Sequence, residues 1–473
     1  MRLNRTTALA TAGVLTLGLL AACGTDTPAP GASTTPGGST GTTAGAEQVT
    51  ISVAGLLPGS KKEAVDQLEE RVKAFEAKYS NIKVETREYQ WLASTFTTQL
   101  AGGTLPTVFE IPLTDGKTLI ENGQLANLDA QVAALGIKDK FSTAAIDAGK
   151  GADGQIYAIP AKSFYSVTLH YNRDLFTQAG LDPDKPPTTW DEIRAAAKTI
   201  TEKTSVPGYG MMALDNAGGW QLTAAAYSRG GRVQTSSGDT YTATLTDPAV
   251  KAHLEWLKAL RWEDGSIYPG TELGWGEINA AFAAGQIAMY TSGSDIYNAL
   301  VENNGVTKDF GYGLAPVPTE GANAGALTGG TYAAVRTDAT DAEKDAAVKW
   351  IYHWYLEPQL DQDAAVANAK SRFDAGQAVG TPVLPIFSKA EYETSMGWIK
   401  EYINVPLDHV SAYTNVMFDQ PLVGEPSRST QPTYGLLFPI VQAVLTDKNA
   451  DVDALLAKAN TQAQKLIDDG VES

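Results

Sequence analysis

The chain has 473 residues, a formal net charge of −18 and a single cysteine, Cys23. An acidic chain is repelled by phosphate backbones and by anionic lipid surfaces, which argues against nucleic acid and against docking on an anionic membrane surface. A lone cysteine excludes a disulfide within the chain, and the four histidines show no metal-ligand spacing. We therefore expect no cofactor and no metal site, in a chain long enough to build two lobes with cores of their own.

Residues 1–22 are predicted to be a lipoprotein signal peptide. Two arginines give a positive start, and the following apolar and small residues have the length of a secretory signal core. The segment LAAC at residues 20–23 resembles the lipobox of bacterial lipoproteins, in which the signal is cut before the cysteine and the thiol receives a diacylglycerol. The alternative is an ordinary secretory signal that ends near a cysteine. The resemblance implies that Cys23 is lipidated and anchors the protein at the outer face of the cytoplasmic membrane.

Residues 23–46 are predicted to be a disordered linker. After Cys23 the segment carries one charge, no aromatic residue and no aliphatic side chain larger than that of alanine. Such a segment cannot bury an apolar core, so nothing offsets the entropy of ordering its backbone. Ordered structure should begin near Gln48, and residues 47–473 are expected to form the domain that carries the function.

From Gln48 onward, strand-like and helix-like segments alternate. Alternating β-branched residues favour strands, and apolar residues spaced three and four apart favour helices. Strands are predicted over residues 48–56, 81–89 and 107–112. Helices are predicted over residues 61–79, 92–103, 189–203, 247–263, 278–286, 341–356 and 451–469. The helix at residue 189 should begin with a capping box between Thr189 and Glu192. The alternation favours an α/β protein with mostly parallel sheets.

Several stretches, in chain order, carry a family resemblance. The longest is DGQIYAIPAKSFYSVTLHYNRDLFTQAGLDPDKPPTTWDEI at residues 153–193. The others lie at residues 96–111, 119–129, 280–294, 312–318, 327–335 and 440–467. Together they resemble the bacterial extracellular solute-binding proteins of family 1, the maltose- and oligosaccharide-binding group that serves ABC importers. The resemblance spans residues 49–468 and departs from the family at Thr107, usually an aspartate, which we expect to cap or position a local turn.

The resemblance implies a two-lobed α/β fold of the periplasmic-binding-protein type, similar to type II. In that fold the ligand lies in a cleft between the lobes, and hinge crossovers allow the cleft to close. The lobes would be discontinuous: approximately residues 47–161 with 333–392, and 165–328 with 393–473. The first crossover is expected at residues 161–164, because Pro160 restrains the chain just before a polar and aromatic run.

A sugar site combines flat apolar faces, which stack on the C–H faces of the ring, with fixed polar groups for the hydroxyls. The resemblance implies contacts in the loop after residues 107–112, the IPAKSFY turn, the AMYTSGSD strand end, the LTGGTY turn and the start of the penultimate helix. The ligand-site residues that it implies are Thr114, Asp115, Lys162, Phe164, Tyr165, Ser292, Asp295, Gly329, Gly330, Tyr332 and Tyr434. Trp220 and Trp275 are added because they lie among glycines and are not periodic with their neighbours.

Structural roles compete with ligand binding at these positions. For Asp115, Asp295 and Tyr332 the resemblance indicates the region of the site but not which atoms contact the ligand. Gly329 and Gly330 could serve only to turn the chain. Other aromatic residues are predicted to pack because they follow helical patterns: Trp256, Trp262, Trp350 and Trp354. Tyr171 should pack and Asn172 should bond the backbone.

These observations predict a substrate-binding lipoprotein of an ABC transporter. It would capture an extracellular mono- or oligosaccharide as a monomer and deliver it to the permease without catalysis. The same fold could bind another solute, such as a polyamine, glycerol phosphate or an iron complex, or could feed a sensor kinase. A secreted glycoside hydrolase is the enzyme alternative, although the sequence contains no nucleophile elbow, metal motif or phosphate-binding loop.

Overall fold

The computed structural model describes residues 48–60, 62–238 and 240–471. The predicted signal peptide, the lipidation site Cys23 and the predicted linker lie outside the described residues. The first described element is β1, and the expected start of the domain near Gln48 stays a prediction. None of the helices in the described part of the chain is long and apolar enough to cross a membrane.

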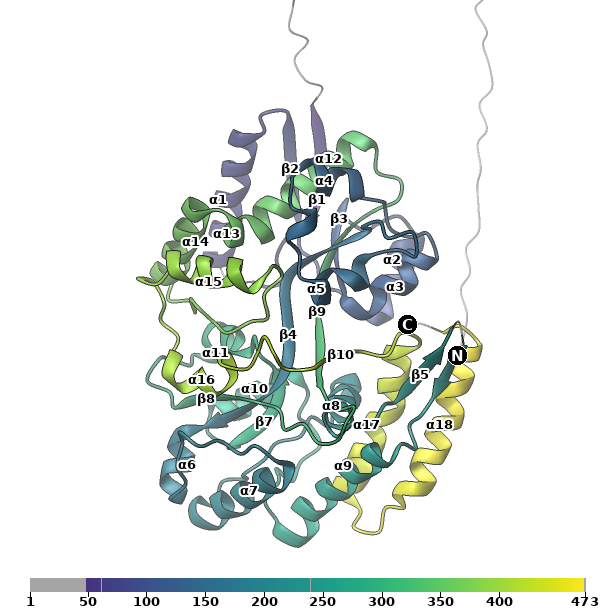
Figure 1. Ribbon diagram of the computed structural model, residues 1–473, viewed down its shortest axis with the longest axis vertical. Helices are drawn as coiled ribbons and strands as arrows, with labels where there is room; N and C mark the ends of the chain where they lie inside the picture. Colours follow the sequence, from purple (N-terminus) through teal and green to yellow (C-terminus); the bar gives the residue numbers. More distant parts are fainter. Residues whose placement is uncertain (1–47, 61, 239, 472–473) are drawn as a thin grey trace, which may run out of the picture. The chain divides into compact units, whose positions relative to one another are not determined.

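The strands are short except for two. Their bounds are β1 Val49–Ala54, β2 Ile82–Arg87, β3 Val108–Pro112, β4 Ala158–Asn172, β5 Gln234–Ser237, β6 Thr240–Ala243, β7 Met289–Gly293, β8 Tyr312–Pro316, β9 Ala326–Val335 and β10 Leu422–Gly424. Figure 1 shows the long strands β4 and β9 side by side, running from the elements around β1–β3 to those around β7 and β8.

Helices surround these strands. The α-helices are α1 Lys62–Lys78, α2 Ala93–Ala101, α3 Leu113–Glu121, α4 Asp129–Ala134, α5 Thr143–Ile146, α6 Arg173–Ala179, α7 Trp190–Thr204, α8 Asp215–Ser228, α9 Pro248–Ala259, α10 Trp275–Ala283, α11 Ile296–Asn304, α12 Asp341–Ile351, α13 Glu357–Leu360, α14 Gln362–Asp374, α15 Lys389–Trp398, α16 Leu407–Thr414, α17 Thr430–Thr446 and α18 Val452–Asp468. Shorter 3₁₀ turns lie at Lys138–Lys140 and Asp147–Gly149, and π-helical turns lie at Leu260–Asp264 and Tyr352–Leu356. The predicted strands and helices are confirmed, with boundary shifts of a few residues.

The main sheet is mixed, which corrects the prediction of mostly parallel sheets. Its order is β2-β1-β3-β9-β4-β7, with β10 pairing to β9 and β8 pairing to β4. The pairs of β1 with β2 and β3, and of β10 with β9, are parallel. The long strands β4 and β9 run antiparallel to each other, and β3, β7 and β8 pair antiparallel to them. Two long antiparallel strands therefore join the elements around β1–β3 to those around β7 and β8.

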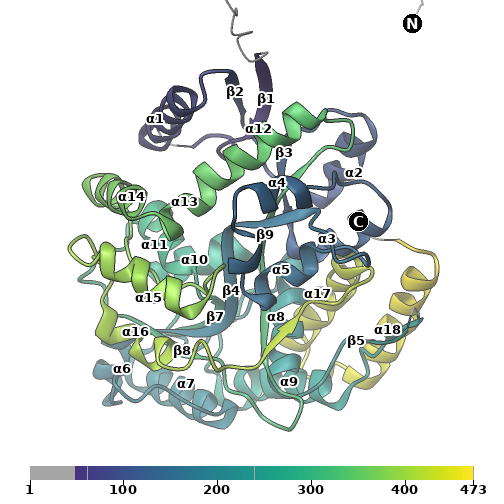
Figure 2. The same cartoon turned by 45° about the horizontal axis from the view of Figure 1, so that its top comes forward.

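We call the elements packed around β1–β3 the first lobe, and those packed around β7 and β8 the second lobe. The paired strands β4 and β9 pass between them (Figure 2). Their register shifts between Ala161 and Phe164, and the bulge between these residues holds Lys162 at φ 40°. A positive φ is costly for a residue with a side chain, so this backbone is strained. The irregularity falls at the predicted first crossover, while the lobe limits given by the sequence remain a prediction.

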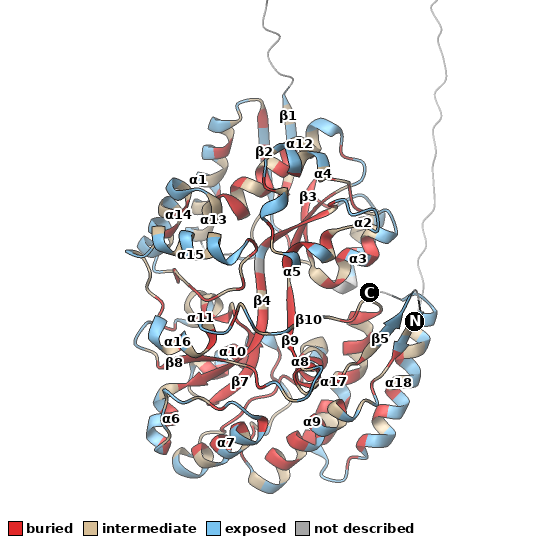
Figure 3. Ribbon diagram, viewed as in Figure 1, coloured by how far each residue is buried: buried red, intermediate tan, exposed pale blue. Residues whose placement is uncertain are grey.

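Three hydrophobic clusters hold the described residues together. One begins at β1 and α1, includes Phe75 against the buried Trp350, and continues through Phe164 to Tyr290. A second surrounds Trp190 in the second lobe, and a small third one lies beneath α2 and α3. Figure 3 shows that β4 and β9 are buried over most of their length while the helices present exposed outer faces.

Local signals in the sequence account for several elements. The capping box of Thr189 and Glu192 at the start of α7 is confirmed. Asn172 accepts hydrogen bonds from two backbone N–H groups at the start of α6, and the ring of Tyr171 is buried, as predicted. The buried Thr107 joins β3 to β1, because its backbone N–H donates to the Ser52 hydroxyl over 2.9 Å.

Candidate functional site

Aromatic rings and carboxylates come together just beyond the bulge of β4. The rings of Tyr165 and Trp220 lie 6.3 Å apart in an edge-to-face arrangement. The hydroxyl of Tyr434 donates to Oε1 of Glu425 over 2.9 Å. Asp295 and Glu425 both lie close enough to Tyr165 to act on its hydroxyl electrostatically. We call Tyr165, Trp220, Asp295, Glu425 and Tyr434 the inner cluster.

The first lobe contributes a carboxylate facing this cluster. Asp115 acts electrostatically on Glu425, although it lies in the first turn of α3. The family resemblance predicts Thr114 and Asp115 in a loop after β3. That prediction is wrong, because α3 begins directly at Leu113. The hydroxyl of the buried Thr114 donates to Asp115 over 3.1 Å.

Tyr165 is held in place by its strand partner. In the pairing of β4 with β9, Tyr165 lies opposite Gly329. A Cβ atom built on Gly329 would lie 2.6 Å from the Tyr165 hydroxyl, a distance that real side chains do not tolerate. Gly329 is therefore required for the close approach of the Tyr165 side chain to β9.

Helix packing in the second lobe brings Trp220 and Tyr434 into the cluster. α8 and α17 pack so closely that a Cβ atom on Gly219 would lie 2.2 Å from the backbone oxygen of Tyr434. The glycines before Trp220 therefore serve helix contact rather than a flexible loop. Trp220 lies on α8 with a half-buried side chain, whereas the ring of Tyr434 is buried. Tyr434 consequently positions Glu425, and the half-buried ring of Trp220 lies beside Tyr165 and bonds Glu425.

The two second-lobe carboxylates of the inner cluster are destabilised in their charged forms. Burial raises the pKa of Glu425 to about 7, against hydrogen bonds from Tyr434 and Trp220 that lower it. Burial also raises the pKa of Asp295 to about 6. Burial raises the pKa of Tyr165 well above its usual value, and Glu425 and Asp295 add to that shift. A carboxylate whose charged form is destabilised by burial gains strongly from a hydrogen bond that a ligand donates to it.

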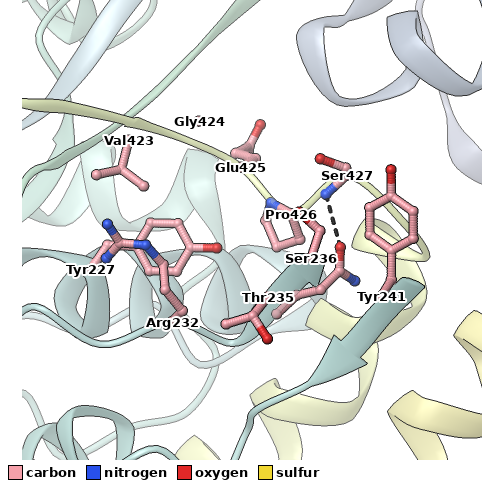
Figure 4. A pocket seen from close by; sticks show the side chains of 11 residues that line it. Tyr227, Arg232, Thr235, Ser236, Tyr241, Val423, Gly424, Glu425, Pro426 and Ser427 are labelled. Carbon is pink, nitrogen blue, oxygen red and sulfur yellow. Dashed lines mark hydrogen bonds between the residues drawn. The ribbon is translucent and has the colours of Figure 1, made fainter. Parts of the chain in front are cut away.

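A cavity of about 550 Å³ lies between the lobes next to this cluster. α3 and residues 147–152 form its wall in the first lobe, and residues 424–427 form its wall in the second. Thr114 and Glu425 line this cavity and, with Asp115, belong to the region described above. The cavity size falls within the usual range for small-molecule sites. The same 424–427 segment also borders a smaller cavity of about 170 Å³, lined otherwise by second-lobe residues (Figure 4).

A second network, centred on the buried Glu110, lies on the hinge side of the first lobe. Oε2 of Glu110 pairs with the ammonium group of Lys162 over 3.1 Å, and Oε1 accepts from the Tyr355 hydroxyl over 2.7 Å. The Tyr89 hydroxyl donates to the backbone oxygen of Glu110 over 2.8 Å. Lys162 thus ties its strained bulge to β3 and to the π-helical turn after α12.

The remaining predicted site residues lie elsewhere. Phe164 and Tyr332 are buried in hydrophobic clusters, and the Tyr332 hydroxyl donates to the backbone oxygen of Ala145 over 2.6 Å. Ser292 is fully buried on β7, and Gly330 pairs with Phe164 within the sheet. Trp275 is 48% exposed at the start of α10. No contact places these residues in the inner cluster, so their predicted ligand contacts stay predictions.

Glu425 is the residue of this region that the sequence did not predict. It lies in the segment VGEPSR, between the end of β10 and the start of α17. The resemblance pointed to the start of that helix but named only Tyr434. One signal was available in the sequence. Glu425 stands between a glycine and a proline, a few residues before the start of a helix that the resemblance had already assigned to the site.

Two lobes joined by the paired strands β4 and β9, with a cavity between them lined by polar and charged side chains, are the arrangement expected of a solute-binding protein. A family model described as bacterial extracellular solute-binding protein matches residues 70–372, more than half of the chain. The chain belongs to this family. Proteins of this family bind small molecules outside the cell or in the periplasm and deliver them to ABC permeases.

Known proteins resemble the chain at low identity. The sn-glycerol-3-phosphate-binding periplasmic protein UgpB of Yersinia pestis is 24% identical over 324 residues, which are 64% of this chain and 69% of that protein. The cyclic alpha-maltosyl-1,6-maltose binding protein of Arthrobacter globiformis has a TM-score of 0.65 and 23% identity, over 89% of this chain and 100% of that one. UgpB of Mycobacterium tuberculosis, solved with glycerophosphocholine, has a TM-score of 0.66 and 16% identity, over 90% of this chain and 99% of that one. At these identities the solved structures show the shared fold, and the fold does not name the solute.

Proposed function

We propose that this protein is the carbohydrate receptor of an ABC importer, a binding protein that performs no catalysis. The observation that supports the proposal is the inner cluster. Two partly exposed aromatic side chains, Tyr165 and Trp220, stand beside the carboxylates Asp115, Asp295 and Glu425. Aromatic rings stack on the C–H faces of sugars, and carboxylates accept hydrogen bonds from sugar hydroxyls.

The cavity between the lobes also supports the proposal of a mono- or oligosaccharide ligand. Its walls come from both lobes, so a solute lying in it would touch both and would favour a closed arrangement. The strained bulge at Lys162 lies where β4 passes between the lobes and is the proposed hinge. We further propose that Cys23 carries the lipid anchor that holds this receptor near its permease.

A phosphate ester such as sn-glycerol 3-phosphate is the second candidate. The similarity to UgpB of Yersinia pestis favours it, and two lysines, Lys117 and Lys150, line the cavity. Both lysines already have partners: Lys117 donates to the Tyr241 hydroxyl and Lys150 pairs with Asp147, each over 3.1 Å. The inner cluster, by contrast, contains the carboxylates Asp295 and Glu425, which repel phosphate.

A thermal-melt screen of the purified chain distinguishes the two candidates. The panel contains neutral mono- and oligosaccharides, sn-glycerol 3-phosphate, glycerophosphocholine and polyamines. A solute present at 100 times its dissociation constant adds about 2.7 kcal/mol of stability, which raises the melting temperature by a few degrees. A shift with a saccharide class supports the proposal. A shift with the phosphate esters or polyamines alone would contradict it.

A further inference from the structure

The two lobes are tied across the edge of the cavity by a group of charged and aromatic side chains. In the first lobe, Lys117 and Glu121 lie four residues apart on α3, on the helix face that lines the cavity. In the second lobe, Tyr241 lies on β6 and Arg428 precedes α17. These side chains do not belong to the inner cluster.

Tyr241 stands between two cations. The ammonium group of Lys117 donates to the Tyr241 hydroxyl over 3.1 Å and lies 5.7 Å from the ring centroid. The guanidinium carbon of Arg428 lies 5.2 Å from the same centroid. Both cations are within the range at which a ring attracts a positive charge. Tyr241 therefore bridges a cation of the first lobe and a cation of its own lobe.

Arg428 also reaches across to α3 directly. Its guanidinium forms an ion pair with Glu121 and donates to the Thr118 hydroxyl over 3.3 Å. The Arg428 and Glu121 side chains are 25% and 40% exposed, so water screens this pair only in part. Each contact is weak alone, but the four side chains share partners and act together.

The second-lobe half of this group is anchored firmly. Gln234 on β5 accepts hydrogen bonds from the backbone N–H groups of Ser427 and Arg428, each over 3.1 Å, and donates to the Arg428 backbone oxygen over 2.8 Å. Figure 4 shows Tyr241 beside Ser427 and the bond from Ser427. The side chain of Gln464 on α18 bonds the backbone of β6: it donates to the Tyr241 carbonyl oxygen and accepts from the Ala243 N–H group. The hairpin of β5 and β6 therefore moves with the second lobe.

We propose that Lys117, Glu121, Tyr241 and Arg428 form a latch across the cleft that sets how long a bound solute is retained. The latch rests on the proposed function only in requiring that a solute binds between the lobes. Opening the cleft must break the latch contacts, so they add to the free energy of the closed state without touching the solute. The latch therefore governs dissociation more than association.

The decisive experiment measures the separation of the lobes. In the full chain with Cys23→Ser, spin labels at Glu69→Cys on α1 and Lys203→Cys on α7 report the distance between two exposed helix surfaces. The test variant is Tyr241→Ala with Arg428→Gln. The matched control is Arg232→Gln, which removes an arginine stacked 5.0 Å from Tyr227 inside the second lobe.

The test variant should gain a longer and broader distance component, while the control keeps the distances of the parent chain. Higher salt should produce the same change more weakly in the parent chain, since the ion pair is screened. Identical distance distributions in the parent and the test variant would overturn the latch. Tyr241→Phe and Glu121→Gln remove single polar contacts without loss of packing, and they serve if the double variant fails to fold.

Dissociation of the solute identified in the melt screen provides the second readout. The test variant should release it about tenfold faster, as expected from losing one partly exposed ion pair and its cation–π contacts, with little change in association rate. The lobe distances are measured without solute, so failure to find a saccharide ligand contradicts the proposed function and leaves the latch result standing. Normal retention with unchanged distances contradicts the latch alone.

Discussion

Two carboxylates on opposite sides of the hinge, the buried Glu110 and the half-buried Glu425, have different surroundings. Glu110 in the first lobe pairs with the cation of Lys162 and accepts from Tyr355. Glu425 in the second lobe accepts from the neutral donors Tyr434 and Trp220, and burial raises its pKa to about 7. A carboxylate that already holds a cation serves structure, because its charge is compensated within the protein. A carboxylate held by neutral donors keeps capacity for a ligand.

The largest expected effect is on ligand affinity, which should depend on the network of Glu425 and not on that of Glu110. Trp220→Ala removes a ring beside Glu425 and should weaken saccharide binding about 100-fold, corresponding to about 3 kcal/mol. Tyr355→Phe removes a donor to Glu110 and should change affinity by less than about threefold. Isothermal titration calorimetry measures both. Equal losses in the two variants would mean that the networks do not differ in role.

The next effect concerns stability. Glu110→Ala leaves Lys162 without its partner at a strained bulge and removes an acceptor from Tyr355, so unfolding should become easier by about 2 kcal/mol. Chemical denaturation at pH 7 measures this free energy. Glu425→Gln is the contrasting variant, because it retains an acceptor for Tyr434 and removes only a disfavoured charge. A loss of stability in Glu425→Gln as large as in Glu110→Ala would contradict the comparison.

The pH dependence of stability tests the burial of Glu425. The folded-state pKa of about 7 lies above the ordinary value of 4.5, so the folded protein holds this proton more tightly than the unfolded chain. Stability from this group is present below pH 4.5 and is lost as the pH rises through 7. Glu425→Gln should therefore be more stable than the parent at pH 8.5, by about 3 kcal/mol, and nearly equal to it near pH 4.5. Melting curves across that range decide the point, and a constant difference at every pH would contradict it.

The smallest effect isolates one hydrogen bond. Tyr434→Phe removes the hydroxyl that favours the ionised form of Glu425, so the pKa of Glu425 should rise further, with a cost to the charged form of about 1 kcal/mol. Carbon-detected NMR titration of the Glu425 carboxyl measures the shift. A lowered pKa in this variant would show that solvent entry, rather than the lost donor, dominates.

Much of the fold could be predicted from the sequence. Apolar spacing located α1, α7, α9, α12 and α18, and the Thr189 and Glu192 pair marked a helix start that the structure confirms. Strand direction could not be predicted, because alternation of side chains is the same in parallel and antiparallel strands. The antiparallel pairing of β4 with β9 made the sheet mixed, contrary to the prediction.

The candidate site could be predicted only as a set of regions. The family resemblance predicted Tyr165, Asp295 and Tyr434, and the position of Trp220 among glycines predicted Trp220. The four residues come together in the structure. Glu425 was missed because it stands in a segment with no periodicity, and only tertiary packing brings it to Trp220. Burial also separates Tyr332 from the cluster, a fact that no local pattern reveals.

The crystal structure of the complex with the saccharide that gives the largest melt shift tests the central claim most directly. Our account predicts a sugar ring against Trp220, with hydroxyls bonded to Glu425 and to Asp115 from the other lobe. A sugar bound away from Trp220 and Glu425, or a phosphate ester held by Lys117 and Lys150 in its place, would contradict it.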